Sequence, residues 1–119
     1  MLFRSFHIEM PLLPGHGTSV EDMIPTGWSD WSAAADAAYQ TLAARSRKVV
    51  VVGLSMGGAL TLRVGADHPE VAGLVCINPA AQPQADDVIA MLQGMIDGGT
   101  DVIPGIGSDI ADPDATERA

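Results

Sequence analysis

The serine at position 55 stands between a run of valines and a helix-forming segment. Residues 49–52 are four consecutive valines, a pattern typical of a strand buried on both faces of a parallel sheet. The sequence Gly53-Leu54-Ser55-Met56-Gly57-Gly58 follows, and residues 58–64 have helical character. A strand, a sharp turn with a central serine and a helix together raise the serine hydroxyl above the sheet edge. We therefore interpret Ser55 as a catalytic nucleophile.

The neighbours of Ser55 have types that suit this turn, which is called a nucleophile elbow. Ser55 must adopt a strained backbone conformation, and strain of this kind persists only where the surrounding structure enforces it. Gly53 and Gly57 lack a Cβ atom, so we expect strand and helix to approach closely on either side of the serine. The N–H group of Met56 would donate to a developing oxyanion. The alternative is a serine that only caps the helix.

Further motifs along the chain resemble one family. They are Pro11–Ser19, Trp28–Trp31, Gly53–Gly58, His68–Glu70 and Asn78–Ala80. Their types and order resemble those of bacterial carboxylesterases and monoacylglycerol lipases of the α/β-hydrolase superfamily, over almost the whole chain from about Phe6 to Glu117. The resemblance implies an α/β fold class: a partial α/β-hydrolase fold with a parallel sheet, flanking helices and the start of a lid insertion. It also implies hydrolysis of carboxylic esters through an acyl-enzyme on Ser55.

The same resemblance implies parts that this sequence lacks. The family has roughly twice this length, an upstream loop that supplies a second oxyanion donor, and an acid and a histidine well downstream of the serine. His68 is the only histidine after Ser55, and a helix would hold it about 20 Å from the serine along the axis. His16 lies in a loop between Gly15 and Gly17, where a structural role is the simpler interpretation. The assignment of catalytic residues therefore stops at Ser55 and Met56.

Residues 1–80 are predicted to form core strands and helices of an incomplete domain. The predicted strands are Phe6–Met10, Val49–Leu54 and Gly73–Asn78. The predicted helices are Asp30–Ser46 and Ser55–Asp67, and Ser29 is the expected N-cap of the first helix. This order implies parallel crossovers. We expect His7 to be half-buried in the first strand, and Asp30 and Asp36 to be solvated charges on a helix face.

Residues 81–119 are predicted to begin the lid. Residues 85–96 fit an amphipathic helix, and several glycines and prolines follow it. The alternative is a surface segment whose helix places Met91 and Met95 in a packed core, since methionine commonly fills gaps there.

Composition narrows the possible partners. The chain has 119 residues and a net charge of −9, which argues against nucleic acid or an anionic membrane as partner because both require basic patches. Cys76 is the single cysteine and allows no internal disulfide. The apolar runs are of strand length and no secretory signal is apparent, so we expect no membrane span and a cytoplasmic location. We expect no metal ion and no cofactor, and a small-molecule or lipid ester as substrate.

Two interpretations of the whole chain remain open. In the first, it is part of an active serine hydrolase of the carboxylesterase or monoacylglycerol lipase type. In the second, it is a truncated remnant without catalytic activity. Either way a piece of a larger sheet exposes edges and faces that the rest would cover, so we expect weak stability in isolation.

Overall fold

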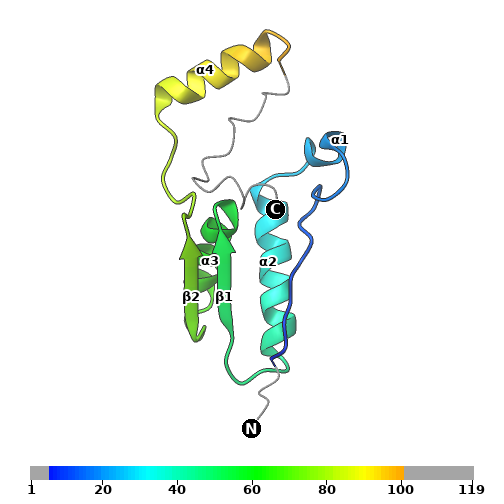
Figure 1. Cartoon of the computed structure of the whole chain (residues 1–119), viewed down its shortest axis with the longest axis vertical. Helices are drawn as coiled ribbons and strands as arrows, with labels where there is room; N and C mark the ends of the chain where they lie inside the picture. The colour runs from blue at the N-terminus through cyan, green and yellow to red at the C-terminus, as the bar shows by residue number, and fades with distance from the viewer. Residues whose placement is uncertain (1–5, 101–119) are drawn as a thin grey trace, which may run out of the picture. The chain divides into compact units, whose positions relative to one another are not determined.

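The computed structural model describes residues 6–100 and divides the chain into two compact units, Met1–Gln82 and Pro83–Ala119. The first unit holds α1 (Val20–Met23), α2 (Trp28–Ala43), β1 (Val50–Leu54), α3 (Met56–Asp67) and β2 (Gly73–Ile77), in that order (Figure 1). The second unit holds α4 (Asp86–Asp97). The alternation of strand and helix in the first unit is that of an α/β protein.

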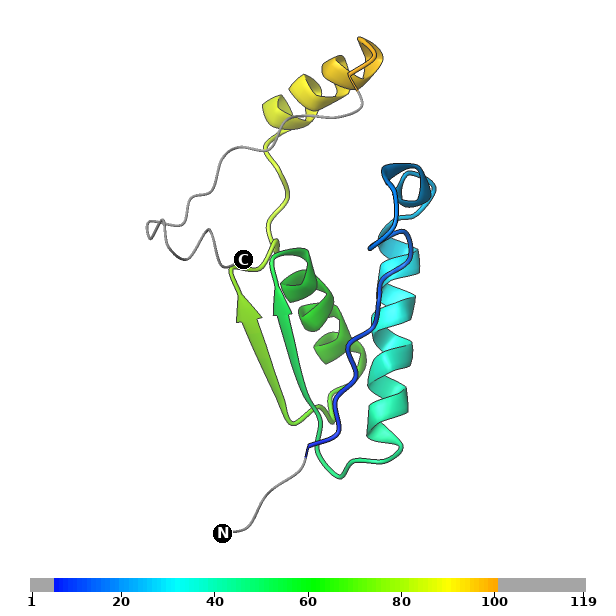
Figure 2. The same ribbon diagram turned by 45° about the vertical axis from the view of Figure 1, so that its right-hand side comes forward.

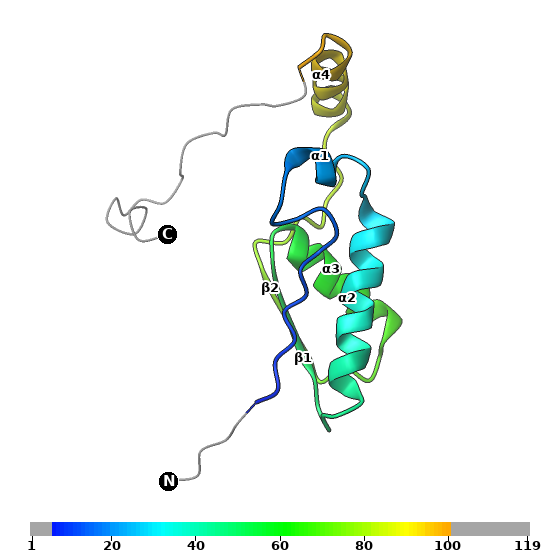
Figure 3. The same cartoon turned by 90° about the vertical axis from the view of Figure 1, so that its right-hand side faces the viewer.

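β1 and β2 form a parallel pair connected through α3. The register runs from Val50 opposite Gly73 to Leu54 opposite Ile77. Helix α3 packs on both strands, and α2 packs on α3 (Figure 3). The expected parallel sheet with flanking helices is thus confirmed, and the predicted bounds of β1, α3 and β2 differ from the observed ones by one residue at most.

The core of the first unit lies on the helix side of the sheet. Tyr39, Val49, Leu60 and Val64 are buried there, and Thr61 is only 2% exposed. Side chains on the other face of the sheet remain in solvent: Val50, Val52 and Leu54 are 54%, 61% and 64% exposed. Parallel sheets in α/β proteins are normally covered on both faces. The described residues therefore supply the cover of one face only.

The predicted first strand is absent. Residues 6–13 form neither a helix nor a strand and take part in no sheet ladder within the described residues. A strand needs a neighbour to receive its N–H and C=O groups, and β1 pairs only with β2 in this part of the chain. His7, expected to be half-buried, is exposed.

The start of α2 also differs from expectation. The N-cap is Gly27 rather than Ser29, and the helix begins at Trp28. The Gly27 N–H donates to the carboxylate of Asp30 over 2.9 Å, which satisfies a backbone group at the helix start. Asp30 is therefore a capping residue and not simply a solvated charge.

A cluster of polar side chains joins α2 to the end of α3. His68, the C-cap of α3, has its Nε2 atom 2.5 Å from Asp36 Oδ1 and its Nδ1 atom 3.3 Å from Glu70 Oε1. Its ring lies 4.3 Å, between centroids, from the ring of Tyr39, whose hydroxyl donates to Glu70 over 3.3 Å. His68 is thus a helix-terminal residue, as expected, whereas Asp36 is part of an ion pair instead of a solvated charge.

Helix α4 of the second unit is amphipathic but has no buried residue. Val88, Leu92 and Met95 are half-buried, whereas Met91 is 58% exposed.

Within residues 6–100, no helix combines the length and the apolar character needed to cross a membrane. The predicted residues of the lid beyond position 100 lie outside the described part of the chain.

The His68 cluster predicts a pH-dependent stability. The hydrogen bond with Asp36 raises the pKa of His68 above its usual 6.5, and the same bond lowers the pKa of Asp36 from its usual 3.8. The pKa of Glu70 is lowered from its usual 4.5, chiefly by a backbone hydrogen bond. The cluster therefore stabilises the fold fully between pH 4.5 and 6.5. Its contribution is lost as pH rises through the raised pKa of His68, and as pH falls through the lowered pKa values of the acids.

We expect a His68→Gln variant to have a lower urea midpoint than the wild type at about pH 5.5, with a difference that shrinks towards about pH 9. Asp36→Asn is the matched variant, because it removes the carboxylate that raises the pKa of His68. Its urea midpoint should differ from that of the wild type in the same pH-dependent way. A difference between wild type and His68→Gln that stays constant over this range would contradict the assignment.

Candidate functional site at the turn between β1 and α3

Ser55 occupies the single residue between β1 and α3 and has a strained backbone. Its φ of 52° and ψ of −117° lie where residues other than glycine are rarely found. Ser55 is the N-cap residue of α3, yet its side chain makes no capping hydrogen bond, and the residue is exposed. The side-chain oxygen of a serine that only caps the helix would accept a hydrogen bond from a backbone N–H of the first turn. The geometry thus leaves the hydroxyl available for chemistry.

Backbone hydrogen bonds hold this strained residue at both ends. The Ser55 N–H donates to the carbonyl of Ile77 over 3.0 Å, which continues the pairing of β1 with β2. The Ser55 carbonyl accepts from Gly58 and Ala59 in the first turn of α3 and from Ala80 over 3.0 Å. Ser55 is therefore fixed by β2 and by the turn after β2 as well as by its own helix.

Close approach of strand and helix requires glycine at position 53. A Cβ atom built on Gly53 would lie 2.0 Å from the carbonyl oxygen of Gly57 and 2.5 Å from the hydroxyl of Thr61. A Cβ on Gly57 would meet nothing within 4 Å in the described residues, so the expected steric reason for that glycine is not found there. The second close approach lies at Gly58, where a Cβ would be 2.7 Å from Pro79 Cβ.

The sequence predicts Asn78 as the last residue of a strand, whereas β2 ends at Ile77 and the turn that follows it was not predicted. Asn78 has a positive φ of 43°, and Pro79 follows it against Gly58. Asparagine tolerates this conformation better than most residues, and proline stiffens the next position. An Asn-Pro pair directly after an apolar strand is the signal that could have pointed to this turn.

The first residues of α3 provide backbone donors beside the serine. Met56 is the first helical residue, and no backbone acceptor for the Met56 or Gly57 N–H is found within residues 6–100. Unpaired N–H groups and the positive end of the helix dipole favour negative charge at this point. An oxyanion formed next to Ser55 would therefore be stabilised by the protein backbone.

His16 and His68 both form hydrogen bonds with groups other than Ser55. His16 Nδ1 is 3.1 Å from the carbonyl of Pro14, which also accepts from Trp31 Nε1 over 3.0 Å, and the rings of His16 and Trp31 meet edge to face. His68 is held by Asp36 and Glu70. Within residues 6–100, no side chain hydrogen-bonds the Ser55 hydroxyl, and no three potential metal ligands cluster. The described residues thus place an exposed serine beside free backbone N–H groups but bring no base to it.

The contrast between the glycines gives a stability prediction. Gly53→Ala should destabilise the fold by about 3 kcal/mol or more, because the new Cβ would collide with backbone atoms that cannot move aside cheaply. Gly57→Ala is the matched control: it places a methyl group in open space inside a helix and should be neutral or stabilising by up to about 1 kcal/mol. Urea unfolding followed by circular dichroism measures both changes. Equal effects of the two substitutions would show that the close approach is incorrect.

The positive φ of Ser55 gives a second prediction. Glycine adopts this conformation without strain, so Ser55→Gly should be more stable than Ser55→Ala by about 1 kcal/mol after the entropy cost of glycine is included. Both variants lose the hydroxyl, and the comparison therefore isolates the backbone strain. If the alanine variant were as stable as the glycine variant in urea unfolding, the strained turn would be ruled out.

The chain is similar to known proteins over most of its length. A family model described as the alpha/beta hydrolase family matches residues 2–117. A thermostable monoacylglycerol lipase of Bacillus sp. (strain H-257) is 42% identical over 112 residues, which are 92% of this chain and 43% of the relative. A solved structure from work on the metagenome-derived lipolytic enzymes LipS and LipT is 37% identical, with a TM-score of 0.67, and the match covers 85% of this chain and 41% of that one. The chain thus spans about two fifths of the length of either protein. It belongs to the alpha/beta hydrolase family.

Proposed function

We propose that Ser55 is the nucleophile of a serine hydrolase that acts on carboxylic esters. The observation that carries this proposal is the strained, exposed Ser55 at the start of α3, whose side chain is not used as a cap. Strain at a residue other than glycine persists where function selects it. The likeness to a monoacylglycerol lipase and to lipolytic enzymes supports an ester as the substrate.

The proposed reaction has two steps. Ser55 Oγ attacks the ester carbonyl while a histidine, contributed from outside the described residues, takes the hydroxyl proton. The Met56 N–H donates to the resulting oxyanion, and a good donor of this kind contributes about 3 kcal/mol. The alkoxide leaves with the proton from the histidine, and the acyl group stays on Ser55. Water then attacks the acyl-enzyme with the help of the same base and releases the acid.

The proposed substrate is an ester with a lipid-like acyl chain. The family fold by itself does not fix a substrate, since related sites also cleave thioesters. The lipolytic relatives favour a carboxylic ester over a thioester.

We place the chain in the cytoplasm, as the sequence predicts.

Residues 81–119 are proposed to begin a lid over the acyl chain. Helix α4 supports this role because its apolar side chains are not used up in a core: Ile89, Met91 and Ile96 are 51%, 58% and 58% exposed. An amphipathic helix with an unburied apolar side is suited to contact a lipid substrate.

A chimera tests the function. Residues 1–119 would replace the aligned stretch of the Bacillus monoacylglycerol lipase, whose remaining chain would contribute the missing catalytic groups. We expect a folded chimera to hydrolyse p-nitrophenyl esters and to gain one phosphonyl group from a fluorophosphonate probe. Ser55→Ala should abolish the adduct and lower kcat by about 10⁴-fold or more.

The isolated chain is the companion sample. We expect no adduct on it, because no described side chain acts as a base towards Ser55. A folded chimera without an adduct, or with hydrolysis that survives Ser55→Ala, would contradict the proposal. A folded chimera without an adduct would favour the alternative interpretation, in which the chain is a truncated remnant without catalytic activity.

A further inference from the structure

Ser55 and Met56 share one peptide unit, which joins the strained residue to the backbone donor beside it. The Ser55 carbonyl and the Met56 N–H are the two ends of this unit, and its bond is trans. A trans peptide is planar, so its C=O and N–H bonds point in opposite directions. The hydrogen bonds that hold the Ser55 carbonyl therefore also determine where the Met56 N–H points.

Three N–H groups donate to the Ser55 carbonyl. Those of Gly58 and Ala59, over 2.9 Å and 3.2 Å, belong to the first turn of α3. Donors from the helix itself are usual at an N-cap carbonyl. The third donor is the N–H of Ala80, over 3.0 Å, and it comes from the turn after β2. The bond from Ala80 is therefore the one that ties this peptide unit to an element other than its own helix.

The turn that carries Ala80 reaches back to the start of α3. The two parallel strands end at the same edge of the sheet, where α3 begins (Figure 2). Asn78 turns the chain with a φ of 43°, and Pro79 lies 2.7 Å from the position that a Cβ atom on Gly58 would take. In the part of the chain that the structure describes, Ser55 and Asn78 are the two residues other than glycine with positive φ. Backbone strain of this kind is concentrated at functional sites.

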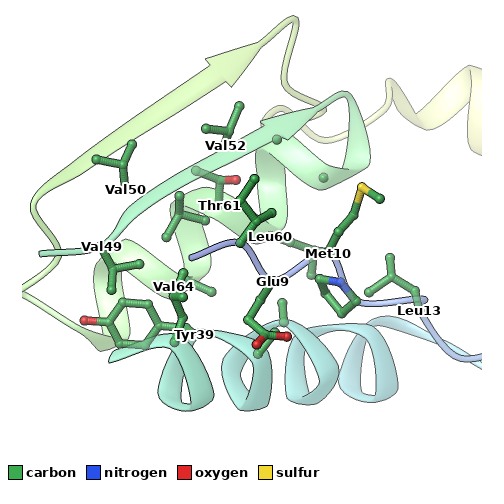
Figure 4. Close-up of a pocket in the computed structure, with 18 of the residues that line it drawn as sticks. Glu9, Met10, Leu13, Tyr39, Val49, Val50, Val52, Leu60, Thr61 and Val64 are labelled. Carbon is green, nitrogen blue, oxygen red and sulfur yellow. The ribbon is translucent and has the colours of Figure 1, made fainter. Parts of the chain in front are cut away.

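The described support for this peptide unit comes from the side of β2. An apolar groove of about 620 Å³ lies along β1, and no residue of β2 lines it (Figure 4). Its lining includes Leu54 and Gly57 but neither Ser55 nor any residue of 78–80. Besides α3 itself, the turn after β2 is therefore the described element that fixes the direction of the Met56 N–H.

We propose that the turn of residues 78–80 positions the oxyanion donor. The Ala80 N–H holds the Ser55 carbonyl, and in this way it aims the N–H of Met56. It also polarises this N–H, because hydrogen bonds that follow one another through a peptide unit strengthen each other. The inference rests on the function proposed above for Ser55 and Met56. An oxyanion develops only in the transition state, so the turn contributes to kcat and not to substrate binding.

A purely structural role of the turn leads to a different expectation. If residues 78–80 only completed the fold, loss of the bond from Ala80 would lower the free energy of unfolding. The folded fraction would then keep its kcat, because the Met56 N–H would still point at the oxyanion.

A backbone ester at position 80 tests the proposal. Lactic acid in place of Ala80, introduced by nonsense suppression, removes the N–H and keeps the methyl side chain. The sample is the chimera with the Bacillus lipase, which contributes the base. We expect kcat for p-nitrophenyl esters to fall by about 10- to 100-fold with an unchanged KM, less than the roughly 10²- to 10³-fold loss when a whole oxyanion donor is removed. Affinity for a trifluoromethyl ketone, whose hemiketal oxyanion mimics the transition state, should fall by the same factor.

Lactic acid in place of Ala81 is the matched control. The Ala81 N–H donates to the Pro79 carbonyl over 2.9 Å and not to Ser55. This ester therefore makes the same chemical change one residue along the chain and keeps the bond from Ala80. Its kcat should stay within about twofold of the wild type. Circular dichroism and urea unfolding show that both esters are folded. An equal loss of kcat in the two esters would leave the turn with a structural role only.

A second measurement needs no variant. In the unmodified chain of 119 residues, we expect NMR to detect a scalar coupling across the hydrogen bond between the Ala80 nitrogen and the Ser55 carbonyl carbon. Absence of this coupling in the folded chain would overturn the proposal, whether or not the ester at position 80 folds.

The remaining outcomes separate this proposal from the proposed function. An unchanged kcat in the ester at position 80, in a chimera whose Ser55 gains the phosphonyl group, would overturn the positioning role and leave Ser55 as the nucleophile. A folded wild-type chimera without the phosphonyl group would overturn the proposed function, and the positioning role with it.

Discussion

The rest of the structure depends on the contact between the backbone of Gly53 in β1 and that of Gly57 in α3. The helix can start immediately after the strand only because no Cβ separates them, and Ser55 is the single residue left to reverse the chain. This reversal requires a positive φ at Ser55, which strains the backbone of that residue. The hydrogen bonds from Ser55 to Ile77 and from Ala80 to Ser55 then distribute the strain over a second strand and the turn that follows it.

This arrangement explains why the chain shows a well-defined turn within an incomplete domain. The elbow is secured by local elements, β1, α3 and β2, all of which lie within residues 50–80. The sheet face that carries Val50, Val52 and Leu54, and the free edge of β1, require elements from farther away. The geometry around Ser55 is therefore set by neighbours in the sequence, whereas no described residue covers that sheet face.

The local pattern predicted the elbow well. Four β-branched residues, a Gly-x-Ser-x-Gly motif and a helical segment indicated β1, Ser55 and α3 with bounds correct to about a residue. Sequence reasoning was wrong where long-range pairing decides. Residues 6–10 have the composition of a strand but lack a neighbour to bond, and Asp36 is drawn from solvent by His68, 32 positions away. Neither the partner of a strand nor that of a charge can be read from periodicity, because both depend on which segments the fold brings together.

The parallel register has a consequence for the order of folding. Val50 pairs with Gly73 and Leu54 with Ile77, so each contact between the strands closes a loop of only 23 residues. Loop-closure entropy at this length is modest, and the intervening helix forms quickly. A strand, helix and strand of such low contact order can assemble before distant parts of a polypeptide arrive. During synthesis the serine turn would thus be among the first tertiary features to form, with the apolar side chains of Val50, Val52 and Leu54 still exposed to chaperones.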